Sequence, residues 1–228
     1  MQPHPKNKAS EKVTTSDLSK LNPKIKQLNP KRMPRIILAS TSIFRKQLLK
    51  KLHLNFEQIA PDIDETPLSN ETPKEMVERL SLEKALEIAS THPNSIIIAS
   101  DQTAVFNNEP IGKPYTVENA IKQLSDFSGQ CITFYTGLVV INTHTQQTYQ
   151  TLDITNVYFR ELSEMVIRNY IDIEQPLKCA GSFKSEGLGI TLFKRIESAD
   201  PNALIGLPLI ELTNIFYQMG YPLPLQEA

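Results

Sequence analysis

Residues 36–42 read Ile-Ile-Leu-Ala-Ser-Thr-Ser, a short apolar run that ends in three hydroxyl-rich positions. Four consecutive apolar residues are typical of a strand buried on both faces, and serine or threonine is typical of the residue that caps a helix N-terminus. Leu48, Leu49 and Leu52 then supply the apolar face of the helix. The stretch therefore predicts a buried strand that runs directly into a helix.

Segments of strand and helix pattern alternate downstream, and a hairpin follows them. Thr72, Pro73 and Glu75 have the spacing of a capping box with proline at the first helical position, which marks a helix start. Together the segments predict an α/β protein with a mixed sheet. The further expected strands are 56–60, 95–100, 131–142 and 148–159, and the further expected helices are about 72–90, 116–127, 163–173 and 209–219.

The composition is that of an ordinary globular protein. The 228 residues are 40% hydrophobic and 21% charged, which supports a sizeable core and excludes a wholly disordered chain. No apolar run approaches the roughly 20 residues that cross a bilayer, and no secretory signal is evident. Cys131 and Cys179 match neither a disulfide framework nor a metal-binding spacing. We expect a cytoplasmic protein with no membrane partner.

The formal net charge of −1 conceals an uneven distribution. Residues 1–35 hold nine basic and two acidic side chains, a net charge of +7, and the remaining 15 basic and 23 acidic side chains give −8. Residues 1–32 are also rich in proline and polar residues, which predicts a basic disordered extension ahead of one domain at 33–228. Met33 is a candidate initiator. Contact of the tail with nucleic acid is the less favoured alternative to a solvated tail.

Common catalytic motifs are missing from the sequence. Gly112-Lys113-Pro114 has the Gly-Lys pair of a phosphate-binding loop, but proline stands where that loop needs a magnesium-binding hydroxyl. The sequence also lacks a dinucleotide-binding glycine motif, a zinc-binding His-Glu-x-x-His and a Gly-x-Ser-x-Gly elbow. Histidine, zinc and serine-hydrolase chemistry therefore lack support.

Charged residues at the junctions of expected elements remain as candidates. Ser40 and Arg45 flank a helix start, where hydroxyl groups, backbone N–H groups and a guanidinium can hold a phosphate. Asp101 is expected at the end of strand 95–100, where partial shielding from water suits a general base. For each residue the alternative is an ordinary capping, turn or surface role.

Glu65, Lys84 and Lys113 complete the candidate set. Glu65 lies in an acidic loop at 61–67, Lys84 is expected at the edge of an apolar helix face, and Lys113 lies in a tight turn. Two carboxylates and three cations suit a magnesium–triphosphate substrate. The alternative is that the loop acids and the lysines are simply solvated.

The order and spacing of several short motifs resemble the Maf family of nucleoside triphosphate pyrophosphatases over residues 34–222. Three stretches are similar to the 7-methyl-GTP pyrophosphatase branch of that family: the aromatic Phe44 after Ser40-Thr41-Ser42, the triplet 100–102, and residues 179–187. The motifs are Ile37-Leu38-Ala39-Ser40-Thr41-Ser42 with Arg45, Asp62-Ile63-Asp64-Glu65-Thr66, Glu83-Lys84-Ala85, Ser100-Asp101-Gln102, Gly112-Lys113-Pro114, Ser128-Gly129, Tyr135-Thr136-Gly137, Cys179-Ala180-Gly181-Ser182-Phe183-Lys184-Ser185-Glu186-Gly187 and Gly206-Leu207-Pro208.

The resemblance implies a twisted mixed sheet flanked by helices, with two lobes around a deep nucleotide-binding cleft. It implies metal-dependent cleavage between the α- and β-phosphates, with Asp101 as the proton acceptor, and a homodimer. It also implies that Phe44, Gln102 and Glu186 set base specificity. This chain departs from the branch pattern at Ile43, where proline is usual, at Phe44, where tryptophan is usual, and at Lys46, where a second arginine is usual.

We hypothesise that Glu65, with Asp101 or the triphosphate, holds Mg²⁺ or Mn²⁺. Arg45, Lys84 and Lys113 then neutralise the triphosphate while Asp101 activates water. Phe44 offers an aromatic face to the cationic 7-methylguanine ring. The alternatives are a pyrophosphatase for dTTP, UTP or other modified nucleotides, and a non-catalytic nucleotide-binding regulator of septum formation.

Overall fold

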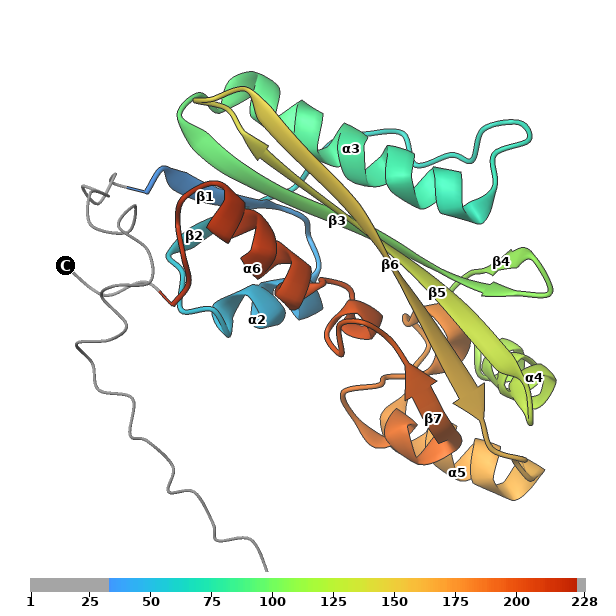
Figure 1. Ribbon diagram of the computed structural model, residues 1–228. Helices are drawn as coiled ribbons and strands as arrows, with labels where there is room; N and C mark the ends of the chain where they lie inside the picture. Colours follow the sequence, from blue (N-terminus) through green and yellow to red (C-terminus); the bar gives the residue numbers. More distant parts are fainter. Residues whose placement is uncertain (1–32, 225–228) are drawn as a thin grey trace, which may run out of the picture. The chain divides into compact units, whose positions relative to one another are not determined.

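A computed structural model describes residues 33–224, which form helices around one open, seven-stranded sheet (Figure 1). The sheet is mixed, as the alternation of elements predicts. The strands are β1 (Arg35–Ala39), β2 (Phe56–Ile59), β3 (Ser95–Phe106), β4 (Glu109–Ile111), β5 (Cys131–Asn142), β6 (Gln147–Phe159) and β7 (Phe193–Glu197).

The helices begin where the sequence places their caps. Ser42, Thr72, Thr116 and Ser163 each accept a hydrogen bond from a backbone N–H in the first turn, and Thr72 and Glu75 form the predicted capping box. The capping predictions are therefore confirmed. The α-helices are α2 (Ile43–Lys50), α3 (Pro73–Thr91), α4 (Val117–Phe127), α5 (Glu164–Glu174) and α6 (Leu209–Gln218).

The strand order is β2-β1-β3-β5-β6-β7, with β4 paired to β3. β1 runs parallel to β2 and β3, because α2 and α3 provide the crossovers that parallel strands need. The remaining neighbours are antiparallel, and β5 and β6 form the predicted hairpin. The chain therefore combines a parallel first half with an antiparallel second half.

Two apolar clusters lie on different parts of the sheet. Figure 1 shows α3 on one side of the strands and α2 and α6 on the other. Ile37, Ile97 and Val139 pack towards Ala85 and Ile88 of α3, because alternate residues of a strand share one face. A second cluster joins α4 and α5 to the far ends of β5 and β6. The described core is therefore divided between two parts of the sheet.

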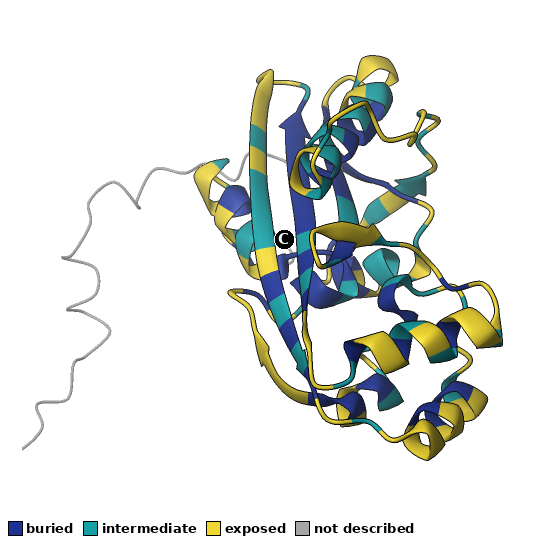
Figure 2. Cartoon of the chain, turned by 90° about the vertical axis from the view of Figure 1, so that its right-hand side faces the viewer, coloured by how far each residue is buried: buried dark blue, intermediate teal, exposed yellow. Residues whose placement is uncertain are grey.

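Burial follows this arrangement. Figure 2 shows buried residues concentrated in the central strands and on the inner faces of the helices. Five phenylalanine rings of the second cluster meet edge-on or tilted, an arrangement that aromatic quadrupoles favour. They are Phe127, Phe134, Phe159, Phe183 and Phe193.

One strand boundary was predicted wrongly, and two short strands were missed. β3 does not end before Asp101 but continues to Phe106, because β5 keeps pairing with it as far as Val105. β1 pairs with β3 only up to Ala99. Asp101 therefore lies inside a strand, just beyond the point where its parallel neighbour stops. β4 and β7 were not predicted from the sequence.

The prediction of a basic extension at residues 1–32 lies outside the described residues, and so does the case for Met33 as the initiator, which depends on that extension. Both stay predictions. Within residues 33–224, no helix is long and apolar enough to cross a membrane.

Candidate active site

A cavity of about 850 Å³ opens where β1 ends beside β3. Its volume lies within the usual range for small-molecule sites. Ligands of α/β sheets commonly bind beyond the carboxyl ends of parallel strands, which is where this cavity lies. The cavity brings together all nine residues that the sequence analysis singled out: Ser40, Phe44, Arg45, Glu65, Lys84, Asp101, Gln102, Lys113 and Glu186.

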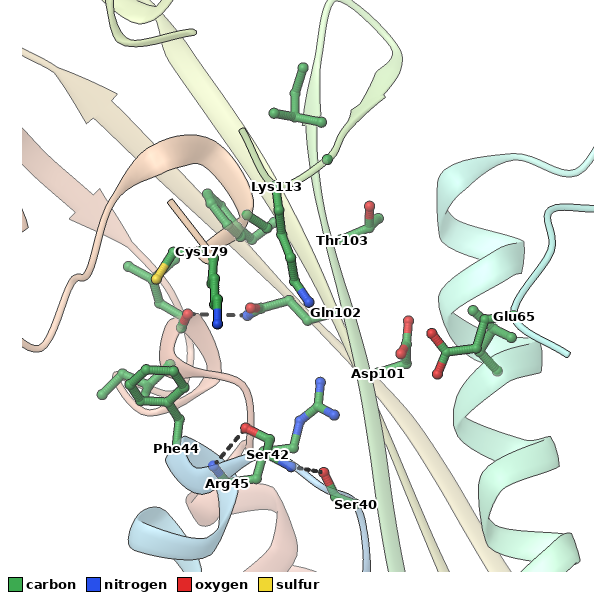
Figure 3. Close-up of a pocket in the computed structure, with 18 of the residues that line it drawn as sticks. Ser40, Ser42, Phe44, Arg45, Glu65, Asp101, Gln102, Thr103, Lys113 and Cys179 are labelled. Carbon is green, nitrogen blue, oxygen red and sulfur yellow. Dashed lines mark hydrogen bonds between the residues drawn. The ribbon is translucent and has the colours of Figure 1, made fainter. Parts of the chain in front are cut away.

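The N-terminus of α2 forms one wall of the cavity. Ser42 Oγ accepts from the Arg45 N–H at 3.3 Å, and Ser40 Oγ accepts from the Ser42 N–H at 3.1 Å. Arg45 Nε donates to the Gly206 carbonyl at 2.9 Å, so one edge of the guanidinium is fixed. Figure 3 shows the guanidinium directed into the cavity. This wall offers hydroxyl groups and a held cation to an anionic ligand.

Burial lowers the pKa of the Arg45 guanidinium from its ordinary value. The negative charges of Asp101 and Glu65 act in the opposite direction. Arginine stays protonated in proteins because its ordinary pKa is very high. Arg45 therefore faces the two acids across the cavity as a permanent positive charge.

Lys84 stands between the two candidate carboxylates. Its Nζ lies 2.6 Å from Asp101 Oδ1 and 2.7 Å from Glu65 Oε1. The Lys84 side chain is only 7% exposed and that of Asp101 13%, whereas Glu65 is 62% exposed. Lys84 lies with Val77 and Leu80 among the buried residues of α3, and its ammonium points inward to these partners, so the alternative of a solvated lysine is wrong. Figure 3 shows the carboxylates of Glu65 and Asp101 facing each other, with Asp101 on β3 and Glu65 on the loop before α3.

The backbone of Asp101 is hydrogen-bonded to a side chain of α3. Its backbone N–H donates to Ser81 Oγ at 2.9 Å, and Ser81 Oγ donates to the Val77 carbonyl at 2.7 Å. Among the described residues, no donor reaches Asp101 Oδ2. One carboxylate oxygen is therefore fixed by Lys84 and the other faces the cavity.

The remaining predicted residues lie on other walls of the same cavity. Lys113 follows β4 and is exposed, and Figure 3 shows it extending towards Gln102. Phe44 is half-buried on α2, and Glu186 is exposed on the loop after η2 (Ala180–Ser182). Phe44 and Glu186 thus come from segments more than a hundred residues apart and border one space.

Three residues of this site were not predicted to belong to it, although Thr136 stands in the quoted motif Tyr135-Thr136-Gly137. Lys178 lines the cavity as a further cation, and it directly precedes the quoted motif at Cys179. Ser81 and Thr136 carry no charge, but they hold Asp101 and Gln102. Cys179 also lines the cavity, and burial raises the pKa of its thiol, which disfavours a thiolate nucleophile.

The donor set fits a divalent cation only in part. Within residues 33–224, no group of three or more His, Cys, Asp or Glu side chains gathers to hold a metal. Glu65 and Asp101 supply two carboxylates within reach of one ammonium, Lys84 Nζ. Magnesium commonly uses one or two carboxylates and completes its shell with phosphate oxygens and water. The residues present therefore suit a cation that arrives with a phosphorylated ligand.

Comparison with known proteins identifies the class to which this site belongs. Residues 35–219 match the Maf family, described as Maf-like proteins, so this chain belongs to that family. Relatives named "7-methyl-GTP pyrophosphatase" come from several bacteria. The chain is 60% identical to the one from Hydrogenovibrio crunogenus, over 85% of this chain and 96% of the relative. It is 53% identical to the one from Alcanivorax borkumensis (84% and 98%) and 50% identical to the one from Colwellia psychrerythraea (82% and 94%).

Proposed function

We propose that this chain is a hydrolase that converts 7-methyl-GTP to 7-methyl-GMP and pyrophosphate in the cytoplasm, and so clears a modified nucleotide. The observation that carries the proposal is the Lys84–Asp101–Glu65 cluster in a cavity lined by further cations. The names of the relatives and their 50–60% identity support the same substrate.

The phosphate chain would bind along the cationic side of the cavity. Ser40 and Arg45 lie at the start of α2, and Lys113 projects from the opposite wall. Within residues 33–224, only the Nε of the Arg45 guanidinium donates a hydrogen bond, to Gly206, so its other N–H groups can take a phosphate oxygen. These groups would hold the triphosphate against the acidic charge of residues 36–228, and they would stabilise charge that develops as pyrophosphate leaves.

Asp101 would act as the general base. Lys84 fixes Oδ1, so Oδ2 is left to accept a proton from the attacking water. The water oxygen would bond to the α-phosphorus in line with the departing bridge oxygen, and the α–β phosphoanhydride bond would break. The proton would pass to Asp101, and pyrophosphate would carry away the electron pair of the broken bond.

A divalent cation, Mg²⁺ or Mn²⁺, would be held by Glu65, with Asp101 or the triphosphate, and it would supply Lewis-acid polarisation of the phosphate oxygens. Glu65 is mostly exposed, so its carboxylate can leave Lys84 without opening the core.

The base would lie at the other end of the cavity. Methylation makes 7-methylguanine a delocalised cation, which prefers an aromatic face such as Phe44. The Glu186 carboxylate would balance that charge and accept from the ring N–H and one hydrogen of the exocyclic amine. Gln102 lines the same cavity and would contact the base edge. We also propose a homodimer, which the family resemblance implies and sedimentation velocity would test.

A substrate panel tests the proposed function. The full chain is incubated with Mg²⁺ or Mn²⁺ and 7-methyl-GTP, GTP, dTTP or UTP, and pyrophosphate and orthophosphate are measured separately. We expect pyrophosphate release with the highest kcat/KM for 7-methyl-GTP. Faster cleavage of dTTP or UTP would assign the chain to another specificity. Tight binding without cleavage of any triphosphate would favour a regulatory nucleotide-binding protein.

A further inference from the structure

The side-chain amide of Gln102 is anchored by three acceptors. Its Nε2 lies 2.9 Å from Thr136 Oγ1, 2.8 Å from the Ala203 carbonyl and 3.1 Å from the Leu204 carbonyl. Thr136 Oγ1 itself donates to the Ala203 carbonyl at 3.1 Å, so it presents a lone pair to Gln102. Every neighbour of this amide end is therefore an acceptor.

This environment decides which way the amide faces. A flipped Gln102 would place its carbonyl oxygen against the Ala203 and Leu204 carbonyls, which cannot donate a hydrogen bond. The amide NH₂ group of Gln102 must therefore face the segment that contains the 3-10 turn η4 (Ala203–Ile205). Among the residues that the structure describes, none donates to Oε1, and Gln102 lines the cavity. Gln102 consequently offers the ligand an acceptor only.

The segment at 203–206, which anchors Gln102, is itself fixed by hydrogen bonds. The Asp200 carboxylate is buried and accepts from the backbone N–H groups of Asn202 and Ile210, which closes the loop around η4. Ser100 Oγ donates to the Gly206 carbonyl at 2.9 Å, and the same carbonyl accepts from Arg45. One short segment therefore orients the side chains of both Gln102 and Arg45, which line the same cavity.

We propose that Thr136 is a positioning residue for base recognition, which fixes Gln102 Oε1 as the acceptor for the exocyclic amine of a 7-methylguanine-type base. This inference rests on the proposed function, in which Glu186 takes the ring N–H and one amine hydrogen. The second amine hydrogen is then left for Gln102. Thr136 is fully buried on β5 and reaches the ligand only through Gln102.

Single and double variants test this coupling. Thr136→Val removes the hydroxyl at nearly constant volume, and Thr136→Ser keeps the hydroxyl. Gln102→Ala removes the acceptor, and the double variant T136V/Q102A measures whether the two side chains act together. Thr133→Val is the matched control, because Thr133 lies on the same strand and its hydroxyl donates to Asn156, away from the cavity.

The readouts are kcat and KM for 7-methyl-GTP and for 7-methyl-ITP, which lacks only the exocyclic amine. We expect T136V to lower the preference for 7-methyl-GTP by about tenfold, mainly through KM, because a fixed hydrogen-bond acceptor is lost. T136S and T133V should stay within about twofold of the wild type. In the Q102A background, T136V should have almost no further effect on the preference.

Two results would overturn the inference: an unchanged substrate preference in T136V, or a full effect of T136V in the Q102A background. Thermal unfolding checks each variant, and Thr136→Ala replaces T136V in every comparison if T136V does not fold. If the wild type does not cleave 7-methyl-GTP, the proposed function fails. If the wild type cleaves it and the cycle shows no coupling, only the role of Thr136 fails.

Discussion

Gly137 lies directly opposite Asp101 in the β3–β5 ladder, where Ser81 and Val77 of α3 pack against it. A Cβ atom at Gly137 would overlap Ser81 Oγ and lie within 3.0 Å of Val77 Cγ1. The missing side chain is what lets Ser81 reach the Asp101 N–H and Lys84 reach its carboxylate. The geometry of the candidate base therefore depends on a glycine in a neighbouring strand.

Replacing Gly137 with alanine should push α3 away from the sheet. Overpacking of a dense core costs typically 1–3 kcal/mol, so we expect the free energy of unfolding to fall by about that amount. The rate of pyrophosphate release should fall as well, because Lys84 moves with α3. Urea unfolding and steady-state kinetics measure the two effects. Gly112→Ala is the control for stability, because a Cβ at Gly112 meets nothing within 4 Å. Unchanged stability in G137A would contradict the packing argument.

Replacing Asp101 with asparagine should abolish turnover without unfolding the protein. Asparagine keeps the shape of the side chain but cannot accept a proton from water, and general bases contribute about 10²–10⁴-fold to rate. Pyrophosphate release measures the loss, and circular dichroism checks the fold. Asp126→Asn is the matched control, since Asp126 pairs with Lys122 on an exposed face of α4. A rate close to that of the wild type would remove Asp101 from the mechanism.

Arg79 should control the position of Glu65. Its guanidinium donates to the Thr66 carbonyl at 3.2 Å and to Glu71 Oε2 at 2.7 Å, so it ties the loop before α3 to the helix. Lysine keeps the charge but lacks the planar fork that makes both contacts. For Arg79→Lys we expect the metal concentration for half-maximal activity to rise about tenfold or more, a typical effect of residues that support metal ligands. Metal titrations at saturating substrate measure this change.

Arg168→Lys is the control for that experiment, because Arg168 forms a similar pair with Glu164 on the exposed side of α5. An unchanged metal requirement in R79K would show that the loop holds Glu65 without Arg79.

The Arg79–Glu71 pair should also make stability depend on pH. The hydrogen bond from Arg79 lowers the pKa of Glu71 from 4.5 to about 2. A carboxylate with a lowered pKa stabilises the folded state above its unfolded-state pKa, and this contribution is lost as pH falls from about 4.5 through 2. The wild type should therefore lose more stability over this range than Glu71→Gln. Urea unfolding at several pH values tests the difference, and equal slopes for the two proteins would contradict it.

Local sequence patterns determined most elements of this fold. The alternation of buried and capping residues placed β1, α2, α3 and the β5–β6 hairpin, because helix caps and strand periodicity act over a few residues. Six candidate residues were predicted from their places at element junctions, and the family resemblance added Phe44, Gln102 and Glu186. β7 could not be predicted from the sequence, because four of its five residues are exposed and its sequence has no apolar alternation.

The tertiary structure decided how these residues work together. No local pattern predicts that β3 continues past Asp101 or that the Lys84 ammonium lies between two carboxylates. Nor does one predict that the amide NH₂ group of Gln102 faces η4. Each of these features depends on a partner from a distant segment. The sequence by itself thus determined the elements and the chemical groups at their junctions. Only the packing of β5, α3 and the segment at 203–206 fixed the distances, the burial and the hydrogen-bond orientations of those groups.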